Sequence, residues 1–69
     1  MSLSIRNQLP ATITSITPGE AMATVKARLT GGQELTAAIT RDAVADLGLT
    51  EGARVTALIK STEISLATS

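Results

Sequence analysis

Apolar and polar residues alternate along much of the chain. In the segment Ala21–Leu29 every second residue, beginning with Ala21, is apolar, which is the period of a strand with one buried face. Thr30-Gly31-Gly32 follows and has the composition of a hairpin turn, so a partner strand is predicted over Glu34–Ile39. This part of the chain is therefore expected to form an antiparallel hairpin.

Three further segments also favour an extended conformation. The segment Leu3–Thr17 is rich in β-branched residues but contains Pro10, which cannot donate to a strand ladder, so a bend, a bulge or an edge position is expected there. The segments Arg54–Lys60 and Thr62–Leu66 predict a second pair of strands, because both are rich in residues that favour strands and are bounded by turn residues.

Between these strands, Thr40–Leu49 has helical rather than alternating spacing. Its apolar residues fall close to a helical period, Thr40 can cap the start, and Gly48 can end the helix. The predicted element order is β-β-β-α-β-β. That order predicts an all-β protein with one short helix, a five-stranded OB-type Greek-key barrel, in a single domain over residues 1–69.

Size and composition indicate self-association. The chain has 69 residues and is 43% hydrophobic without a single aromatic residue. A domain of this size buries only about 60% of the surface that its unfolded chain exposes. Because Cys and His are both absent, neither a disulfide nor a zinc site can compensate. A homo-oligomer is therefore expected.

Charge and hydropathy exclude several classes of partner. Six basic residues balance six acidic ones, without a run of like charge, so nothing attracts nucleic acid or an anionic membrane. OB-type barrels that bind single strands use aromatic platforms and a basic groove, and this chain has no aromatic residue. Met1–Ser4 does not open a signal segment, and no stretch is long enough to span a bilayer, which predicts a cytoplasmic protein.

The remaining chemistry is hydrogen-bond donation. Without His or Cys, and with its carboxylates scattered, the chain predicts neither an enzyme nor a site for a metal cation. Several donors stand mostly beside small residues, as a fully deprotonated oxyanion requires; they are Ser4, Arg6, Asn7, Thr40, Lys60, Ser61 and Thr62.

Particular segments resemble the molbindins, also called molybdenum-pterin-binding proteins, whose domain is of the Mop or TOBE type. The resemblance covers nearly the whole chain and is carried by Ser4-Ile5-Arg6-Asn7-Gln8-Leu9, Pro18-Gly19-Glu20-Ala21-Met22-Ala23, Ile39-Thr40, Leu47-Gly48-Leu49 with Gly52, and Val55-Thr56-Ala57-Leu58-Ile59-Lys60-Ser61-Thr62-Glu63. It implies an OB-type barrel that binds molybdate, and tungstate as well, for intracellular storage and homeostasis, without an organic cofactor. It also implies a homohexamer, a trimer of dimers, with pockets at subunit interfaces.

The resemblance further implies the residues that hold the anion. Ser4 and Arg6 match a Ser-x-Arg-Asn segment that contacts the oxyanion through hydroxyl and guanidinium groups. Thr40 matches the helix-opening Thr, whose hydroxyl and neighbouring amides face the anion. Lys60 and Ser61 match a Lys-Ala/Ser-Thr-Glu segment that completes the pocket.

Three further positions follow from the same resemblance. Members of the family commonly carry Ser three residues after the helix-opening Thr, whereas this chain has Ala43, so the pocket is expected to use the Ala43 amide or to bind more weakly. Asn7 completes the Ser-x-Arg-Asn segment and is assigned to the anion as well. The corner at Gly19 is assigned to a possible second site near a three-fold axis.

Two other interpretations stay open from the sequence. The chain could be a structural or regulatory oligomerisation module whose anion site has decayed. Nucleic-acid binding by an OB-type barrel is a third, against which the missing aromatic residues argue.

Overall fold

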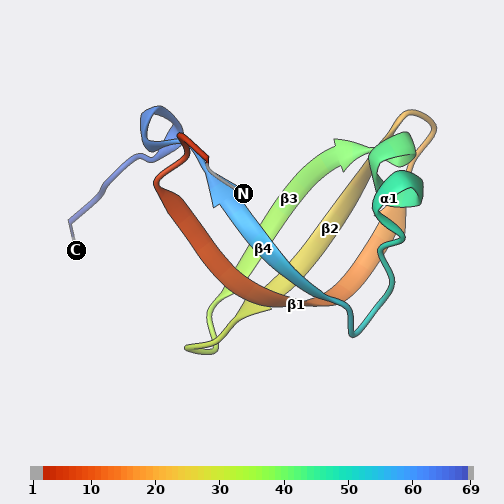
Figure 1. The fold of residues 1–69 in the computed structure, drawn as a ribbon, viewed down its shortest axis with the longest axis horizontal. Coiled ribbons are helices and arrows are strands. Elements are labelled where there is room, and N and C mark those ends of the chain that lie inside the picture. The colour runs from red at the N-terminus through yellow and green to blue at the C-terminus, as the bar shows by residue number, and fades with distance from the viewer. Residues whose placement is uncertain (1–2, 69) are drawn as a thin grey trace.

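The structure, a computed structural model, describes residues 3–68. Met1, Ser2 and Ser69, which the expected domain 1–69 includes, lie outside the described residues. Four antiparallel strands form one sheet in the order β3-β2-β1-β4 (Figure 1). The elements are β1 Asn7–Pro18, β2 Met22–Leu29, β3 Glu34–Thr40, α1 Arg41–Leu47, β4 Arg54–Ile59 and the 3-10 helix η1 Ser61–Glu63.

The long strand β1 organises the sheet because it has a different neighbour on each side. Its N-terminal half, Asn7–Thr12, pairs with β4, and its C-terminal half, Ala11–Pro18, pairs with β2. Pro10 therefore pairs only with β4, because the ladder with β2 begins one residue later. Of the three expectations for Pro10, the structure shows the edge position. The bulge lies further along, between Ile13 and Ser15, where an extra residue increases bend and twist.

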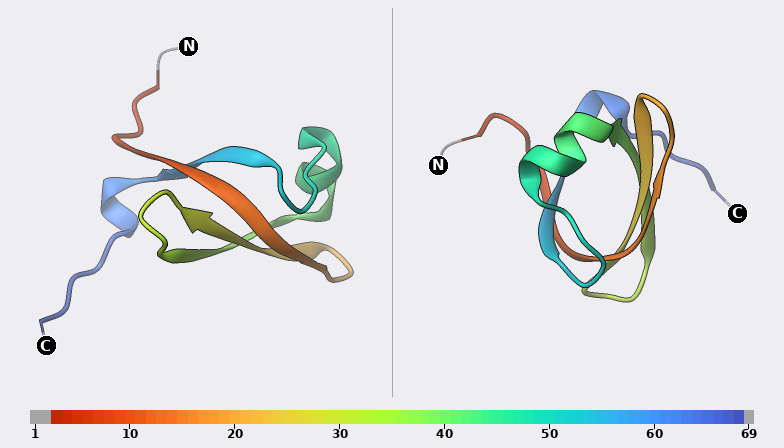
Figure 2. Two further views of the ribbon diagram at one scale, coloured as in Figure 1. Left: turned by 90° about the horizontal axis from the view of Figure 1, so that it is seen from below. Right: turned by 90° about the vertical axis from the view of Figure 1, so that its right-hand side faces the viewer.

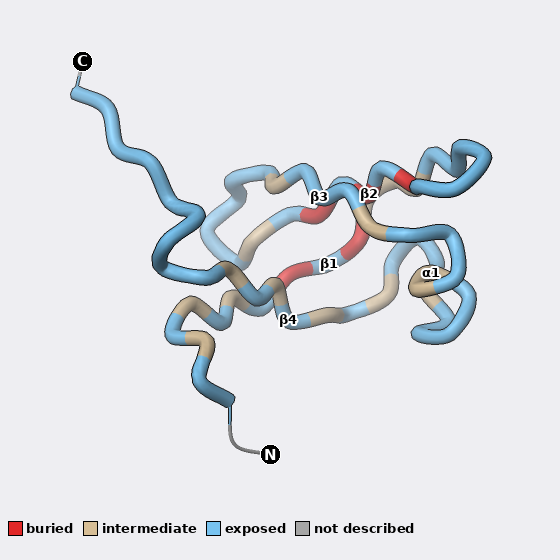
Figure 3. The backbone as a smooth tube through the Cα atoms, turned by 90° about the horizontal axis from the view of Figure 1, so that it is seen from above, coloured by how far each residue is buried: buried red, intermediate tan, exposed pale blue. Residues whose placement is uncertain are grey.

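The sheet curls into a half-barrel with a small core. Seen along its long axis it describes an oval, with β4 and β3 on opposite sides and α1 over one side (Figure 2). The buried positions are confined to β1 and β2 (Figure 3); they are Ala11, Ile13, Ala23, Val25 and Ala27. The alternation predicted for the β2 segment is thus confirmed, since its inward residues are the buried ones.

The predicted helix signals are also confirmed. Thr40 caps α1, because its Oγ1 accepts a hydrogen bond from the Ala43 amide at 3.0 Å. Gly48 ends the helix in the left-handed region at a φ of 64° and donates its amide to the Ala45 carbonyl. No helix among residues 3–68 is long and apolar enough to cross a membrane.

The fifth predicted strand, Thr62–Leu66, is not formed within the chain. The backbone instead turns through η1, where the Glu63 amide donates to the Lys60 carbonyl at 2.9 Å, and residues 64–68 then run away from the sheet without joining a ladder of the described residues. Leu66 is 94% exposed as a result. The structure therefore has four strands, and the five-stranded Greek-key barrel is not confirmed.

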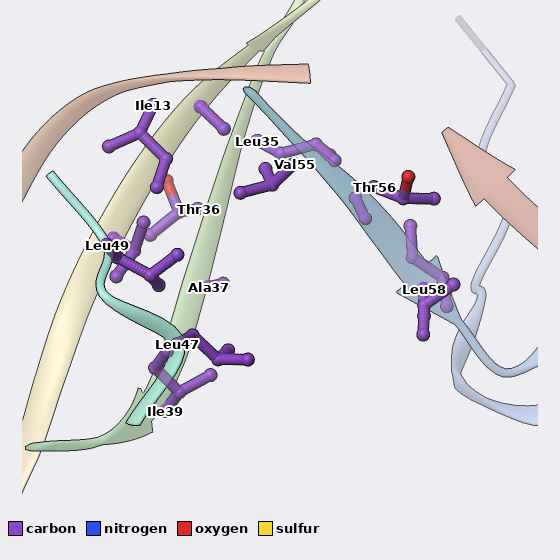
Figure 4. A pocket seen from close by; sticks show the side chains of 14 residues that line it. Ile13, Leu35, Thr36, Ala37, Ile39, Leu47, Leu49, Val55, Thr56 and Leu58 are labelled. Carbon is purple, nitrogen blue, oxygen red and sulfur yellow. The ribbon is translucent and has the colours of Figure 1, made fainter. Parts of the chain in front are cut away.

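An open apolar groove runs along the concave side of the half-barrel. It encloses about 340 Å³. Ile39 of β3, Leu47 of α1 and Val55 of β4 turn their side chains into it (Figure 4). Some of its lining residues are exposed in the single chain, among them Leu47 and Leu58.

Candidate functional site

A polar pocket lies at the end of the molecule where β1 begins and β4 ends. It encloses about 230 Å³ and is lined by two short segments from opposite ends of the sequence: Ser4, Ile5, Arg6, Lys60, Ser61 and Thr62. Four of the eight residues assigned to the anion from the sequence, namely Ser4, Arg6, Lys60 and Ser61, therefore come together here.

Strand pairing brings the two segments together. Asn7 and Ile59 are partners at the end of the β1–β4 ladder, and Asn7 Nδ2 also donates to the Ile59 carbonyl at 3.1 Å. Arg6 directly precedes this pair and Lys60 directly follows it. Asn7 is not among the pocket-lining residues, so within this chain its side chain positions the two segments.

Local hydrogen bonds shape both segments. Gln8 Nε2 donates to the Ile5 carbonyl at 2.9 Å and holds the residues that enter β1. On the other side, the turn of η1 carries Ser61 and Thr62 along the pocket instead of extending β4. Hydroxyl-bearing residues of both segments thus line the same pocket as Arg6 and Lys60.

The pocket's composition favours an anion. Arg6 and Lys60 supply two positive charges, and both are exposed. Ser4, Ser61 and Thr62 supply hydroxyls, while Glu63, the acid nearest in sequence, is not among the lining residues. Hydrogen bonds from charged donors to an oxyanion are about twice as strong as neutral ones. Within residues 3–68 no group of His, Cys, Asp or Glu side chains is arranged to hold a metal ion.

The other assigned residues lie at the helix end of the molecule, around Met22. Thr40 is the register partner of Met22, and the Gly19 amide donates to the Met22 carbonyl at 2.7 Å. A Cβ at Gly19 would lie 2.9 Å from that carbonyl oxygen, which explains the glycine. The Ala43 amide already donates to Thr40 Oγ1, so its hydrogen is engaged and the Thr40 hydroxyl hydrogen remains the donor.

The two groups of residues are far apart within one chain. Asn7 is the first residue of β1, and Pro18 at the other end pairs beside Met22 and Thr40. Eleven residue steps of strand have a contour length of about 35 Å, and the curl of β1 makes the direct distance shorter. Figure 1 shows the start of β1 and η1 at one end of the long axis and α1 at the other. Thr40, Ala43 and Gly19 therefore do not reach the pocket of the same chain.

Thr62 also lines the pocket, although the sequence indicates it only as a donor and not as a residue that binds the anion. The sequence predicts it as the first residue of a fifth strand, whereas η1 brings it to the pocket wall. Its place in the Lys-Ser-Thr-Glu segment was the signal that could have found it.

The TOBE domain model matches residues 3–66. This chain belongs to the TOBE domain family. Molybdenum-pterin-binding protein 1 from Clostridium pasteurianum is 41% identical to this TOBE domain over 66 residues, which are 96% of this chain and 97% of that protein. The resemblance drawn from the sequence is thereby confirmed.

Solved structures with the same fold bear names of the same kind. A molybdate-binding protein from Sporomusa ovata is 47% identical and has a TM-score of 0.93, with 99% of this chain and 100% of the other covered. The cytoplasmic molybdate-binding protein ModG, solved with molybdate bound, is 44% identical and has a TM-score of 0.85, with 88% of this chain and 43% of the other covered.

Proposed function

We propose that this TOBE domain binds molybdate and serves intracellular molybdenum storage and homeostasis. The observation that carries the proposal is the pocket in which Arg6 and Lys60 converge with the hydroxyls of Ser4, Ser61 and Thr62. Similar proteins along the whole chain are named for molybdenum-pterin or molybdate binding. Tungstate is a tetrahedral dianion as well, so the same donors would hold it, and no organic cofactor and no catalytic step are needed.

The proposed site is completed by a second copy of the chain. One copy offers the charged pocket around Arg6 and Lys60, and another offers its helix end with the Thr40 hydroxyl. The separation within the chain, about 35 Å along β1, supports this division. Enclosure between copies removes the anion from water, which strengthens its contacts with the two cations. Rejection of sulfate, which has the same charge, then depends on its smaller size.

The exposed surface supports a homo-oligomer. The chain exposes 5506 Å², whereas a folded monomer of its mass is expected to expose about 4,100 Å². The excess of about 1,400 Å² is nearly twice the roughly 800 Å² that one partner contributes to a standard interface. Contact with more than one neighbour is thus expected. We propose the hexamer, a trimer of dimers, that the resemblance implies.

The fifth strand is proposed to form between copies. The segment Thr62–Leu66 has the composition of a strand, yet Leu66 is 94% exposed. The sheet order leaves β3 and β4 as edge strands on either side of the apolar groove. A tail from a neighbouring copy would pair with such an edge and cover the groove. This exchange would complete the five-stranded OB-type barrel. Residues 1–69 would then form a single domain. We also propose that the protein is cytoplasmic, as the similar protein ModG is described to be.

Isothermal titration calorimetry with molybdate tests the binding proposal. Tight binding that persists in excess sulfate is expected for the parent protein. Arg6→Ala and Lys60→Ala should each weaken binding about 10- to 100-fold, since each removes a charge-assisted contact. Lys26→Ala is the matched control, because Lys26 is exposed on β2, away from the pocket.

The same titration distinguishes the alternative function. Equal affinity in Arg6→Ala, Lys60→Ala and the parent would refute the assigned pocket. Absence of binding in a parent protein that is still oligomeric would refute molybdate binding and leave a structural or regulatory module with a decayed anion site. The feature that favours this alternative is Ala43, which stands where the resemblance implies Ser. Its amide already donates to Thr40 Oγ1.

A further inference from the structure

We propose that the outer face of the sheet carries an additional anion site, separate from the corner at Gly19. This site is a cleft between Arg28 and Arg54 that binds tetrahedral oxyanions, including inorganic phosphate. The cleft encloses about 310 Å³. It shares no lining residue with the pocket around Arg6 and Lys60, so the inference does not depend on the proposed function.

The register of the sheet places two arginines on either side of one threonine. Thr12 of β1 is paired with Arg28 of β2 on one side and with Arg54 of β4 on the other. All three are exposed, whereas their neighbours Ala11 and Ile13 in β1 are buried, so the row belongs to the outer face. Two strand spacings separate the arginine backbones by about 10 Å, which both long side chains can bridge above Thr12.

The cleft opens where the ladder of β1 and β2 begins. That ladder starts at Ala11, so Pro10 extends beyond it, and Thr30 follows the last residue of β2. Pro10, Thr12 and Thr30 line the cleft together with the two arginines, and the apolar residues Ala11, Leu29 and Val55 complete its lining. Two hydroxyls therefore accompany the two guanidinium groups, and a ligand can approach from solvent without a movement of the backbone.

The charges around the cleft are unbalanced toward the positive. Thr12, the residue between Arg28 and Arg54, is neutral, so two like charges share one small region. Glu34 is the register partner of Arg28 on its other side, and Lys26 precedes Arg28 on the same face. Glu34 lies outside the cleft lining and competes for only one of the two guanidinium groups. A dianion between them would relieve the repulsion and accept paired hydrogen bonds from both.

The open shape and the hydroxyls determine which anions fit. A cleft on an exposed face imposes no limit on ligand size, unlike a pocket closed between two copies. Thr12 and Thr30 can each accept as well as donate a hydrogen bond, so monohydrogen phosphate finds an acceptor for its proton. The cleft is thus expected to bind molybdate, sulfate and phosphate with little discrimination, and weakly, with a Kd on the order of 1 mM, because exposed charges are screened.

Titration with inorganic phosphate, followed by amide chemical shifts in NMR, tests the site. The experiment uses the Arg6→Ala/Lys60→Ala protein, so that the proposed molybdate pocket does not contribute. Saturable shifts at the amides of Thr12, Arg28 and Arg54 are expected. Adding Arg28→Gln and Arg54→Gln should raise the Kd about tenfold or more, because both charge-assisted contacts are lost.

Two matched variants separate a built site from general positive charge. Lys26→Gln removes a charge from the same face outside the cleft, and less than about a twofold change is expected for such a screened charge. Glu34→Gln removes the competing acceptor of Arg28 and should tighten binding. Shifts that never saturate, or a Lys26→Gln effect as large as that of the double arginine variant, would overturn the proposal. Molybdate binding by an otherwise unaltered Arg28→Gln/Arg54→Gln protein should stay intact, which keeps the two proposals distinguishable.

Discussion

The two ends of this half-barrel differ in how many of their polar groups already form hydrogen bonds within the chain. At the end formed by Arg6 and Lys60, charged and hydroxyl groups surround a pocket and remain exposed. At the helix end, hydrogen bonds within the chain engage the amides of Gly19, Arg41 and Ala43. One end thus offers charge, and the other offers a rigid wall with the Thr40 hydroxyl. The proposed oxyanion site draws on both ends, which lie at opposite ends of the long axis of one chain.

The largest effect is expected from removing the tail that is proposed to bridge copies. A chain ending at Glu63 loses Ile64 and Leu66, and its apolar groove stays uncovered, so assembly should be lost. Light scattering after gel filtration should then show the mass of one shortened chain, somewhat below the 7.1 kDa of the full chain, instead of a multiple of it. A chain ending at Ala67 keeps the predicted strand and is the control. An unchanged mass for the shorter chain would contradict the exchanged strand.

Mixing two defective proteins tests whether the two ends meet across copies. Arg6→Ala/Lys60→Ala removes the charged end, and Thr40→Val removes the hydroxyl of the other end. When the two proteins are unfolded and refolded together in equal amounts, about a quarter of the sites should combine two intact ends, given random assembly of a symmetric oligomer. Calorimetry should then detect that fraction of tight molybdate sites. Recovery no greater than in the separate proteins would place both ends in one chain.

Thr40→Val by itself should have two smaller effects, one on stability and one on molybdate affinity. The cap on α1 is lost, which costs about 1 kcal/mol of unfolding free energy. The donor to the anion is lost too, which should weaken molybdate binding about tenfold. Chemical denaturation and calorimetry measure the two effects separately. Thr40→Ser keeps the hydroxyl and should restore both; a loss of stability without a loss of affinity would limit Thr40 to capping.

Ala43→Ser should give the smallest change, and in the favourable direction. It supplies the hydroxyl that the resemblance implies at this position, and one added hydrogen bond should tighten molybdate binding about fivefold. Ala43 is partly exposed, so room for one oxygen atom is expected. Affinity unchanged in Ala43→Ser, with stability also unchanged, would show that this position does not face the anion.

Most local elements could be predicted from the sequence because their signals are local. The alternation through Ala23, Val25 and Ala27 identified the buried face of β2, and Thr40 and Gly48 identified the limits of the helix. The bulge between Ile13 and Ser15 carried no such signal. It lies just beyond Thr12, the last residue of β1 that pairs with β4.

The segment Thr62–Leu66 shows why the remainder was not predictable. Its residues favour a strand, but a strand forms only when another strand provides ladder partners, and residues 3–68 provide none for it. For the same reason Thr62 was assigned to a ladder, whereas η1 places it on the pocket wall. Strand propensity predicts that a segment favours an extended conformation, but it does not predict which other strand the segment pairs with.

The sequence by itself determined the strand and helix preferences and the family, because periodicity and motif are properties of the chain alone. The tertiary structure decided which distant residues meet. Pairing of Asn7 with Ile59 brought Arg6 and Lys60 together, and pairing of Thr12 with two strands placed Arg28 and Arg54 on either side of it. The length of β1 separated Thr40 from the pocket around Arg6 and Lys60. The physical reason is that register between strands depends on packing across the whole sheet, which no single segment encodes.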